Sequence, residues 1–205
     1  MRMTTALTVA LGFAITALAC SGSSTGPSQS GNLRVMITDT PFEDATALHV
    51  TFIEVKAHRA DGVGGWITVP FAGTPAATTR TCNLKKLEDA FDILGVASLE
   101  TGQYTQLRLI VESATLYFGG TKTEEAACMT TLAAPTAGPT PVTSHALEIP
   151  SGEVKLIQPF ELTGTGTTTI ELDFDGDQSV RQTGNGRYRM TPVIKILAVN
   201  TGSGS

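Results

Sequence analysis

The feature that most constrains the fold is the segment 167–197, which reads TTTIELDFDGDQSVRQTGNGRYRMTPVIKIL. Apolar and polar residues alternate over 168–174, and this period of two is typical of a β-strand with one buried face. Asn185-Gly186 predicts a tight hairpin turn, because both residue types accept the positive φ that such a turn requires. With strands expected at 178–182 and 187–199 around that turn, the segment indicates antiparallel sheet.

The same signals recur along the chain. Further strands are expected at residues 32–39, 47–58, 66–71, 105–118, 145–149 and 153–162. After Phe52 the apolar alternation slips by one residue, which is the trace that a β-bulge leaves in a sequence. Pro192 lies inside the last strand and indicates an edge or a bulge there. Eight or nine short strands without strand–helix alternation predict an all-β sandwich with Greek-key topology, immunoglobulin-like or transthyretin-like.

One short helix is expected within residues 83–99. Asn83 is a suitable N-cap, and Gly95 is a suitable stop. The apolar residues that fall on one helical face are Leu84, Leu87, Phe91 and Leu94. We expect this helix to lie against the sheets.

The N-terminus has the pattern of a bacterial export signal. Arg2 supplies a positive charge, residues 6–18 are apolar but too short to span a bilayer, and Ala19-Cys20 resembles a lipobox. On this interpretation residues 1–19 are a lipoprotein signal peptide, and a lipidated Cys20 anchors the chain in the bacterial cell envelope, at the outer membrane or cell surface. The alternative is an ordinary secretory signal followed by an incidental cysteine.

The rest of the chain divides into three parts. Residues 20–31 are rich in Ser and Gly and predict a flexible tether, residues 32–199 form the β-sandwich domain, and residues 200–205 form a disordered tail. The formal net charge is -5, and no run of Lys and Arg occurs. Because nucleic-acid binding needs clustered cations to neutralise phosphates, the composition argues against a nucleic-acid partner.

Two further cysteines, Cys82 and Cys128, are expected to form a disulfide, because an exported chain meets an oxidising environment. The alternatives are two free thiols or half of a metal site. Neither cysteine has a His or a second Cys at ligand spacing, which argues against zinc.

A series of motifs resembles a bacterial envelope lipoprotein family catalogued as domain of unknown function 4382. The motifs are MITDTP (36–41), TFIEVKAH (51–58), GGWITV (64–69), FDILG (91–95), GQYTQLRLIV (102–111), IPSGE (149–153), TTIELDFD (168–175) and TGNGRYRMTPVIKI (183–196). The resemblance spans nearly all of residues 33–197. It implies a lipoprotein or secreted domain with a β-sandwich fold, and it implies no activity. The segment that carries Cys128 looks like an insertion relative to the family pattern.

Three acids, Asp173, Asp175 and Asp177, are spaced two apart, which would place them on one face of a strand. Acids at alternate positions offer oxygens to a hard cation, so calcium is a candidate cofactor, with Asp39 and Asp44 as additional ligands. The segment lacks the closing bidentate acid of an EF-hand loop. The alternative is a solvated strand exit with no cofactor.

Trp66 is the candidate ligand-binding residue, because sugar-binding sandwiches stack sugars on exposed aromatic rings. Other aromatic residues that can face solvent are Tyr104, Tyr117 and Tyr188. The alternative is that Trp66 and Tyr104 fill the core or its corners. The three histidines, His49, His58 and His145, each stand on an expected strand without an acid or cysteine at ligand spacing.

These observations favour a lipid-anchored, non-catalytic envelope domain that binds a protein or glycan ligand or acts structurally. The first alternative is a carbohydrate-binding module, assisted by calcium. The second is a hydrolase, which would need a pocket that joins a histidine to two carboxylates, and no catalytic motif such as Gly-x-Ser-x-Gly is present.

Overall fold

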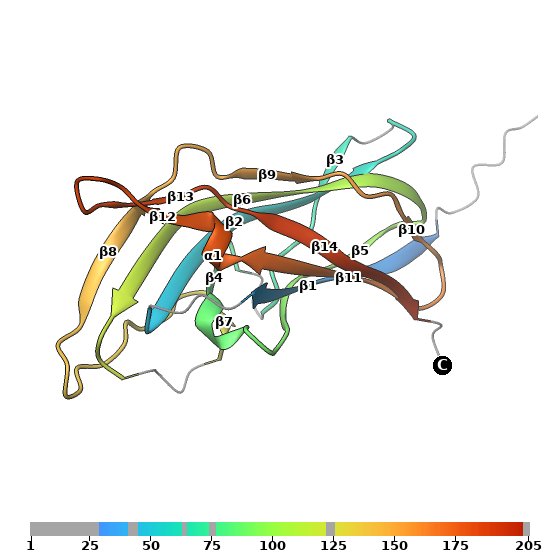
Figure 1. The fold of residues 1–205 in the computed structure, drawn as a ribbon. Helices are drawn as coiled ribbons and strands as arrows, with labels where there is room; N and C mark the ends of the chain where they lie inside the picture. Colours follow the sequence, from blue (N-terminus) through green and yellow to red (C-terminus); the bar gives the residue numbers. More distant parts are fainter. Residues whose placement is uncertain (1–28, 41–44, 63–64, 74–76, 122–125, 203–205) are drawn as a thin grey trace, which may run out of the picture.

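Two long antiparallel strands, β2 (Ala47–Arg59) and β6 (Gly102–Phe118), form the centre of the protein's larger sheet. The structure is a computed structural model that describes residues 29–40, 45–62, 65–73, 77–121 and 126–202. Within these ranges two mixed sheets pack face to face (Figure 1). The prediction of an all-β sandwich is therefore confirmed.

The smaller sheet has four strands in the order β14 (Ile194–Gly202), β11 (Thr167–Asp175), β1 (Ser30–Thr40) and β5 (Asp92–Glu100). β1 pairs with β11 in parallel, whereas the two outer strands pair antiparallel. The β1–β11 pair starts at Asn32↔Thr167 and ends at Thr40↔Asp175, so both strands finish at the same end of the sandwich.

The larger sheet runs through β2 and β6. The other strands on its path are β12 (Val180–Gln182), β13 (Tyr188–Met190), β8 (Thr143–Glu148), β4 (Arg80–Asn83) and β7 (Cys128–Met129). Three short strands pair beside β2 or β6, and these are β3 (Trp66–Thr68), β9 (Glu153–Leu156) and β10 (Phe160–Leu162). Two short helices complete the secondary structure of the described residues, η1 (Leu84–Lys86) and α1 (Gly176–Ser179).

The core lies between the two sheets, where the inward residues of each strand alternate with outward polar ones. Leu33, Val35 and Ile37 of β1 are fully buried, as the period of two predicts. Phe52 of the larger sheet meets Phe174 of the smaller one edge to face, with ring centroids 6.3 Å apart. The pair shows directly that the two inner faces pack on each other.

The β-bulge expected in β2 is confirmed. The register jumps from Phe52↔Val111 to Glu54↔Ile110, so Ile53 has no direct partner and is 39% exposed. This local irregularity returns Val55 and Ala57 to the inner face, because one extra residue restores the phase of the alternation.

The prediction of a short helix within residues 83–99 is wrong. Only the single 3-10 turn of η1 forms, and residues 92–100 are the edge strand β5, which pairs with β1. Phe91, expected on the buried face, is 44% exposed. The free edge of β1 needs a partner for its backbone groups, and that tertiary requirement outweighs a weak local helical pattern.

Two expected strands are interrupted by proline, because proline has no N–H for the ladder. The strand expected at 153–162 is split around Pro159 into β9 and β10, which both pair with β6. The strand expected at 187–199 is split at Pro192 into β13 in the larger sheet and β14 in the smaller one. The strand expected at 178–182 is α1 followed by β12.

The expected domain boundaries need small corrections at both ends. β1 begins at Ser30, inside the proposed tether, and β14 continues to Gly202, inside the proposed disordered tail. The signal peptide and Cys20 lie outside the described residues.

The disulfide between Cys82 and Cys128 is confirmed, with its Cα atoms 4.1 Å apart. It joins β4 to β7, whose two-residue ladder pairs the same two positions. Asp92 of β5 accepts a hydrogen bond from the Cys128 N–H at 2.9 Å. The long connection between β6 and β8 is thus fixed to the sandwich midway along its length.

Candidate functional site

The three acids expected to form a cation site do not converge. Asp173 is buried and accepts from the Thr40 hydroxyl at 2.9 Å and from the Lys195 ammonium at 2.8 Å. Asp175 caps α1 and accepts from the Gln178 N–H at 2.9 Å. The chain leaves the strand at Gly176, so Asp177 is exposed on the helix rather than on the strand face. Among the described residues no three His, Cys, Asp or Glu side chains are grouped to hold a metal ion.

Asp39 does lie near the acidic turn, as expected, but on the inner side of β1. It is 2% exposed, and its Oδ1 accepts from the Gly176 N–H at 3.1 Å. The pKa of Asp39 is raised to about 8: burial is the largest cause, repulsion from Asp173 and Glu88 adds to it, and the Gly176 hydrogen bond and Lys85 act in the opposite direction. Its Oδ2 has no hydrogen-bond partner among the described residues. Asp44, the other proposed ligand, lies outside them.

Trp66 stands on the outer face of the larger sheet and is half-buried. The Arg108 guanidinium carbon lies 4.0 Å from the centroid of its ring, and the His58 ring packs edge-on with a centroid separation of 4.9 Å. One stacking surface of the indole is therefore already occupied by a cation. Tyr104, in contrast, is fully buried, stacks on Phe160 and donates to the Glu100 carbonyl at 2.8 Å, so its corner-filling role is confirmed.

A groove lies at the far end of the larger sheet. It begins with the crossing at the end of β11, where α1 carries the chain into the β12–β13 hairpin of the other sheet. Ser179 holds the crossing together, because its hydroxyl donates to the Asp175 carbonyl at 2.6 Å and accepts from the Val193 N–H at 2.9 Å. These two hydrogen bonds join the segment that enters the β12–β13 hairpin to the segment that leaves it.

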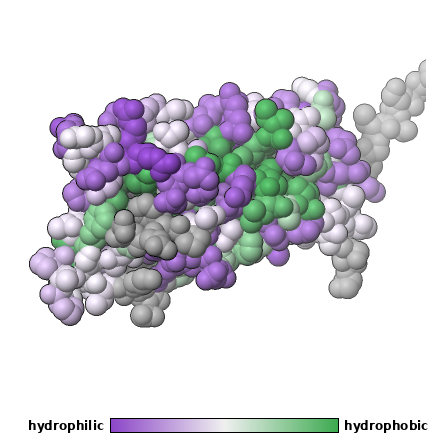
Figure 2. All heavy atoms as spheres, in the orientation of Figure 1, coloured by the Kyte–Doolittle hydropathy of each residue, from purple (hydrophilic) through white to green (hydrophobic). Residues whose placement is uncertain are grey.

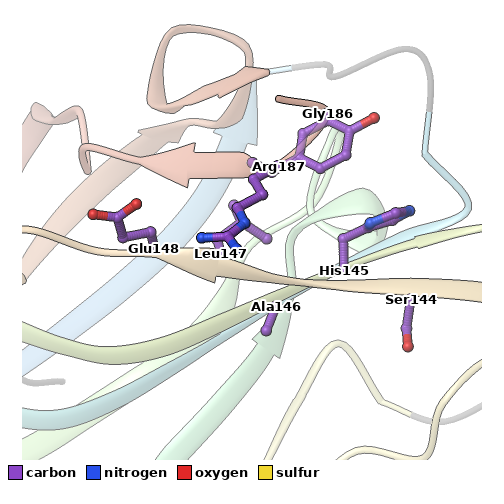
Figure 3. Close-up of a pocket in the computed structure, with 8 residues that line it drawn as sticks. Ser144, His145, Ala146, Leu147, Glu148, Gly186 and Arg187 are labelled. Carbon is purple, nitrogen blue, oxygen red and sulfur yellow. The ribbon is translucent and has the colours of Figure 1, made fainter. Parts of the chain in front are cut away.

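The groove opens where β13 separates from β8. The two strands pair in parallel over only two positions, Tyr188↔Leu147 and Arg189↔Glu148, and then diverge. The gap between them has a volume of about 570 Å³. Its lining residues are Ser144, His145, Ala146, Leu147, Glu148, Gly186, Arg187 and Tyr188 (Figure 3). We call this cavity the β8–β13 groove.

Two aromatic rings, His145 and Tyr188, line the β8–β13 groove, and both pack against Phe118. The His145 and Tyr188 rings lie 5.1 Å apart, and Phe118 lies 5.8 Å from each of them. His145 is directly opposite the core residue Leu116 on β6, so this cluster continues the inner face of the larger sheet. Figure 1 shows β8 and the β12–β13 hairpin beyond the ends of β1 and β11, where the smaller sheet no longer covers that face.

The polar part of the groove consists of charged side chains on its rim. Glu148 forms an ion pair with Arg189 at 3.3 Å. Figure 3 shows the side chain of Arg187 extending toward β8, in the view between Glu148 and His145. Arg187 is exposed and forms no ion pair within the described ranges. The site therefore combines ring faces with free hydrogen-bond donors.

An exposed apolar patch also occurs at the sandwich edge. Ile157 is 81% exposed and Leu197 is 49% exposed, and Figure 2 shows an apolar area right of centre, over the region of β9 and β14. A cavity of about 220 Å³ beside it is lined by Lys155, Leu156, Ile157, Gln158 and Ile196. This cavity is less than half the size of the β8–β13 groove and has no aromatic lining.

Sequence reasoning identified His145 and Tyr188 separately but did not join them. They are 43 positions apart, and only the short parallel pairing of β13 with β8 brings them together. The one local signal was the Asn185-Gly186 turn, which forms within a connection closed by the Thr183 N–H to Arg187 carbonyl bond at 2.8 Å.

The fold and this groove define an all-β sandwich domain with an open, aromatic-lined cavity at one end. The chain belongs to the family described as domain of unknown function (DUF4382), whose family model matches residues 30–192. Comparisons with curated proteins and with solved structures found no match. No helix of the described residues is long and apolar enough to cross a membrane.

Proposed function

We propose that this protein is a non-catalytic carbohydrate-binding module that holds a saccharide in the β8–β13 groove. The observation that carries the proposal is the pair of rings, His145 and Tyr188, that line an open cavity beside charged side chains and pack on Phe118. Pyranose rings have apolar faces that stack on aromatic rings, and their hydroxyls form hydrogen bonds with polar side chains of the site.

A binding role is favoured over hydrolysis by the charges of the groove. Glycoside hydrolysis uses two carboxyl groups that flank the scissile bond. Glu148 is the one carboxylate of the groove lining, and Arg189 engages it. This supports recognition without bond cleavage.

The arrangement of the chain suits display from a membrane. We propose that Cys20 is lipidated and holds the domain at the outer membrane or cell surface of a bacterium. β1 begins at Ser30, at one end of the sandwich. The groove lies beyond the other end, where β1 and β11 both finish (Figure 1). Nine paired residues separate these ends by about 30 Å, so the groove would face away from the anchor.

The binding proposal is tested by a glycan array followed by titration with the best oligosaccharide. We expect Tyr188→Ala to lower the affinity at least tenfold, because it removes a stacking ring. Trp66→Ala is the matched control, since it removes the aromatic residue on the outer face of the same sheet. Loss of binding in the Trp66 variant with retention in the Tyr188 variant would move the site to Trp66 and refute the groove.

The anchor is tested separately with a radiolabelled fatty acid in cells that express the full chain. We expect label on the wild type and none on Cys20→Ala. Label retained by the variant would exclude Cys20 as the acceptor.

A further inference from the structure

The β12–β13 hairpin that forms one wall of the groove is rich in arginine. Arg181, Arg187 and Arg189 all lie on it, and residues 180–190 contain no acid. The whole chain has 14 basic and 19 acidic residues and a formal net charge of -5. The protein as a whole is acidic, so these positive charges need a local explanation. The three arginines differ in the contacts that their side chains form.

The side chains of two of the three arginines are engaged by other groups of the protein. Arg189 is paired with Glu148, and the Arg181 guanidinium donates to the backbone carbonyls of Asp177 and Val180. Arg181 stands directly opposite Arg189 across the hairpin and is not part of the groove lining. Their positions are explained by these contacts alone.

Arg187 is different, because it lines the groove and has no carboxylate or carbonyl partner among the described residues. Its position follows from the turn, in which the Asn185 side-chain oxygen accepts from the Arg187 N–H at 3.2 Å and Thr183 contacts the Arg187 carbonyl. These contacts hold the backbone and leave the guanidinium free. It can therefore meet a group that arrives in the groove.

We propose that the ligand of the β8–β13 groove is an acidic saccharide, whose carboxylate is bound by Arg187 while its ring packs on Tyr188. This proposal rests on the proposed function and specifies its ligand class. A guanidinium presents paired N–H donors that match the two oxygens of a carboxylate. The neighbouring Arg189–Glu148 pair is neutral, so the net charge that a ligand meets there is that of Arg187.

The test compares two ligands with the same sugar backbone: oligogalacturonate, which is charged, and its fully methyl-esterified form, in which each carboxylate is a neutral methyl ester. Titration of the purified full chain at 50 mM salt is expected to give at least tenfold tighter binding of the acid than of the ester. Arg187→Gln should remove that preference and leave the affinity for the ester within twofold. Arg181→Gln makes the same charge change on the same hairpin outside the groove and should retain the preference.

Sulfated dextran and a neutral cello-oligosaccharide separate other ligand classes from the one proposed. Tighter binding of the sulfated polymer than of oligogalacturonate would overturn the assignment of a carboxylate. Equal affinities for acid and ester, or an equal loss in the Arg181 and Arg187 variants, would overturn this inference and leave the carbohydrate-binding proposal standing. Absence of binding to every saccharide, or no effect of Tyr188→Ala, would refute the proposed function itself.

Discussion

Replacing Asp39 by Asn should stabilise the protein at neutral pH and have almost no effect in acid. In the folded chain the carboxyl group is 2% exposed at the end of the core, and burial raises its pKa from the ordinary 3.8 to about 8. Asparagine keeps an oxygen that can accept from the Gly176 N–H and carries no charge. The variant therefore removes the ionisation and retains the hydrogen bond.

The sign follows from proton binding in the two states. Between pH 4 and pH 8 the folded protein holds a proton on Asp39 and the unfolded chain does not, so the free energy of unfolding falls as the pH rises. Each pH unit above the unfolded-state pKa of 3.8 lowers the free energy of unfolding by about 1.4 kcal/mol. The loss is therefore about 4 kcal/mol at pH 7. Asp39 therefore contributes its full stabilisation of the folded state only below about pH 4. That stabilisation is lost as the pH rises, and no further loss occurs above about pH 8.

The assay is urea unfolding of wild type and Asp39→Asn at each pH from 4 to 9. The difference in free energy of unfolding should be near zero at pH 4, rise in favour of the variant, and level off above pH 8. Asp177→Asn, on the exposed helix face, is the matched control and should show no such rise. A difference that does not depend on pH, or an Asn variant less stable than wild type at pH 7, would refute the reasoning.

Three further outcomes are expected. Replacing Cys82 and Cys128 by Ser should lower the free energy of unfolding by about 4 kcal/mol, the entropy of closing a loop with a sequence separation of 46, and reducing agent should then have no further effect. Gly152→Ala should destabilise by about 2 kcal/mol in thermal unfolding, since a Cβ would lie 1.9 Å from the Val111 carbonyl oxygen, whereas Gly184→Ala, with open space around it, should be neutral. Calcium at millimolar concentration should leave the melting temperature unchanged, because the strand acids are engaged by protein groups, and a rise would contradict that view.

Local pattern determined the strands whose two faces differ clearly. Leu33, Val35 and Ile37 alternate with polar residues and occupy the expected face of β1. The slip after Phe52 foretold the bulge of β2, because a one-residue insertion changes the apolar phase directly in the sequence. The pairing of Cys82 with Cys128 needed only the inference of an oxidising compartment.

Pairing between distant segments decided the rest. Residues 92–100 became a strand because β1 offered a free edge, which a helical pattern around Leu84 and Leu87 does not reveal. The acids at 173–177 were separated by the crossing at Gly176, where the chain changes sheets. His145 and Tyr188 meet through two paired positions of β8 and β13, and no local spacing encodes such a contact. The sequence by itself determined which residues of the clearly alternating strands face the core. The tertiary structure decided which surface residues share a groove, because that depends on strand order and on where two strands part.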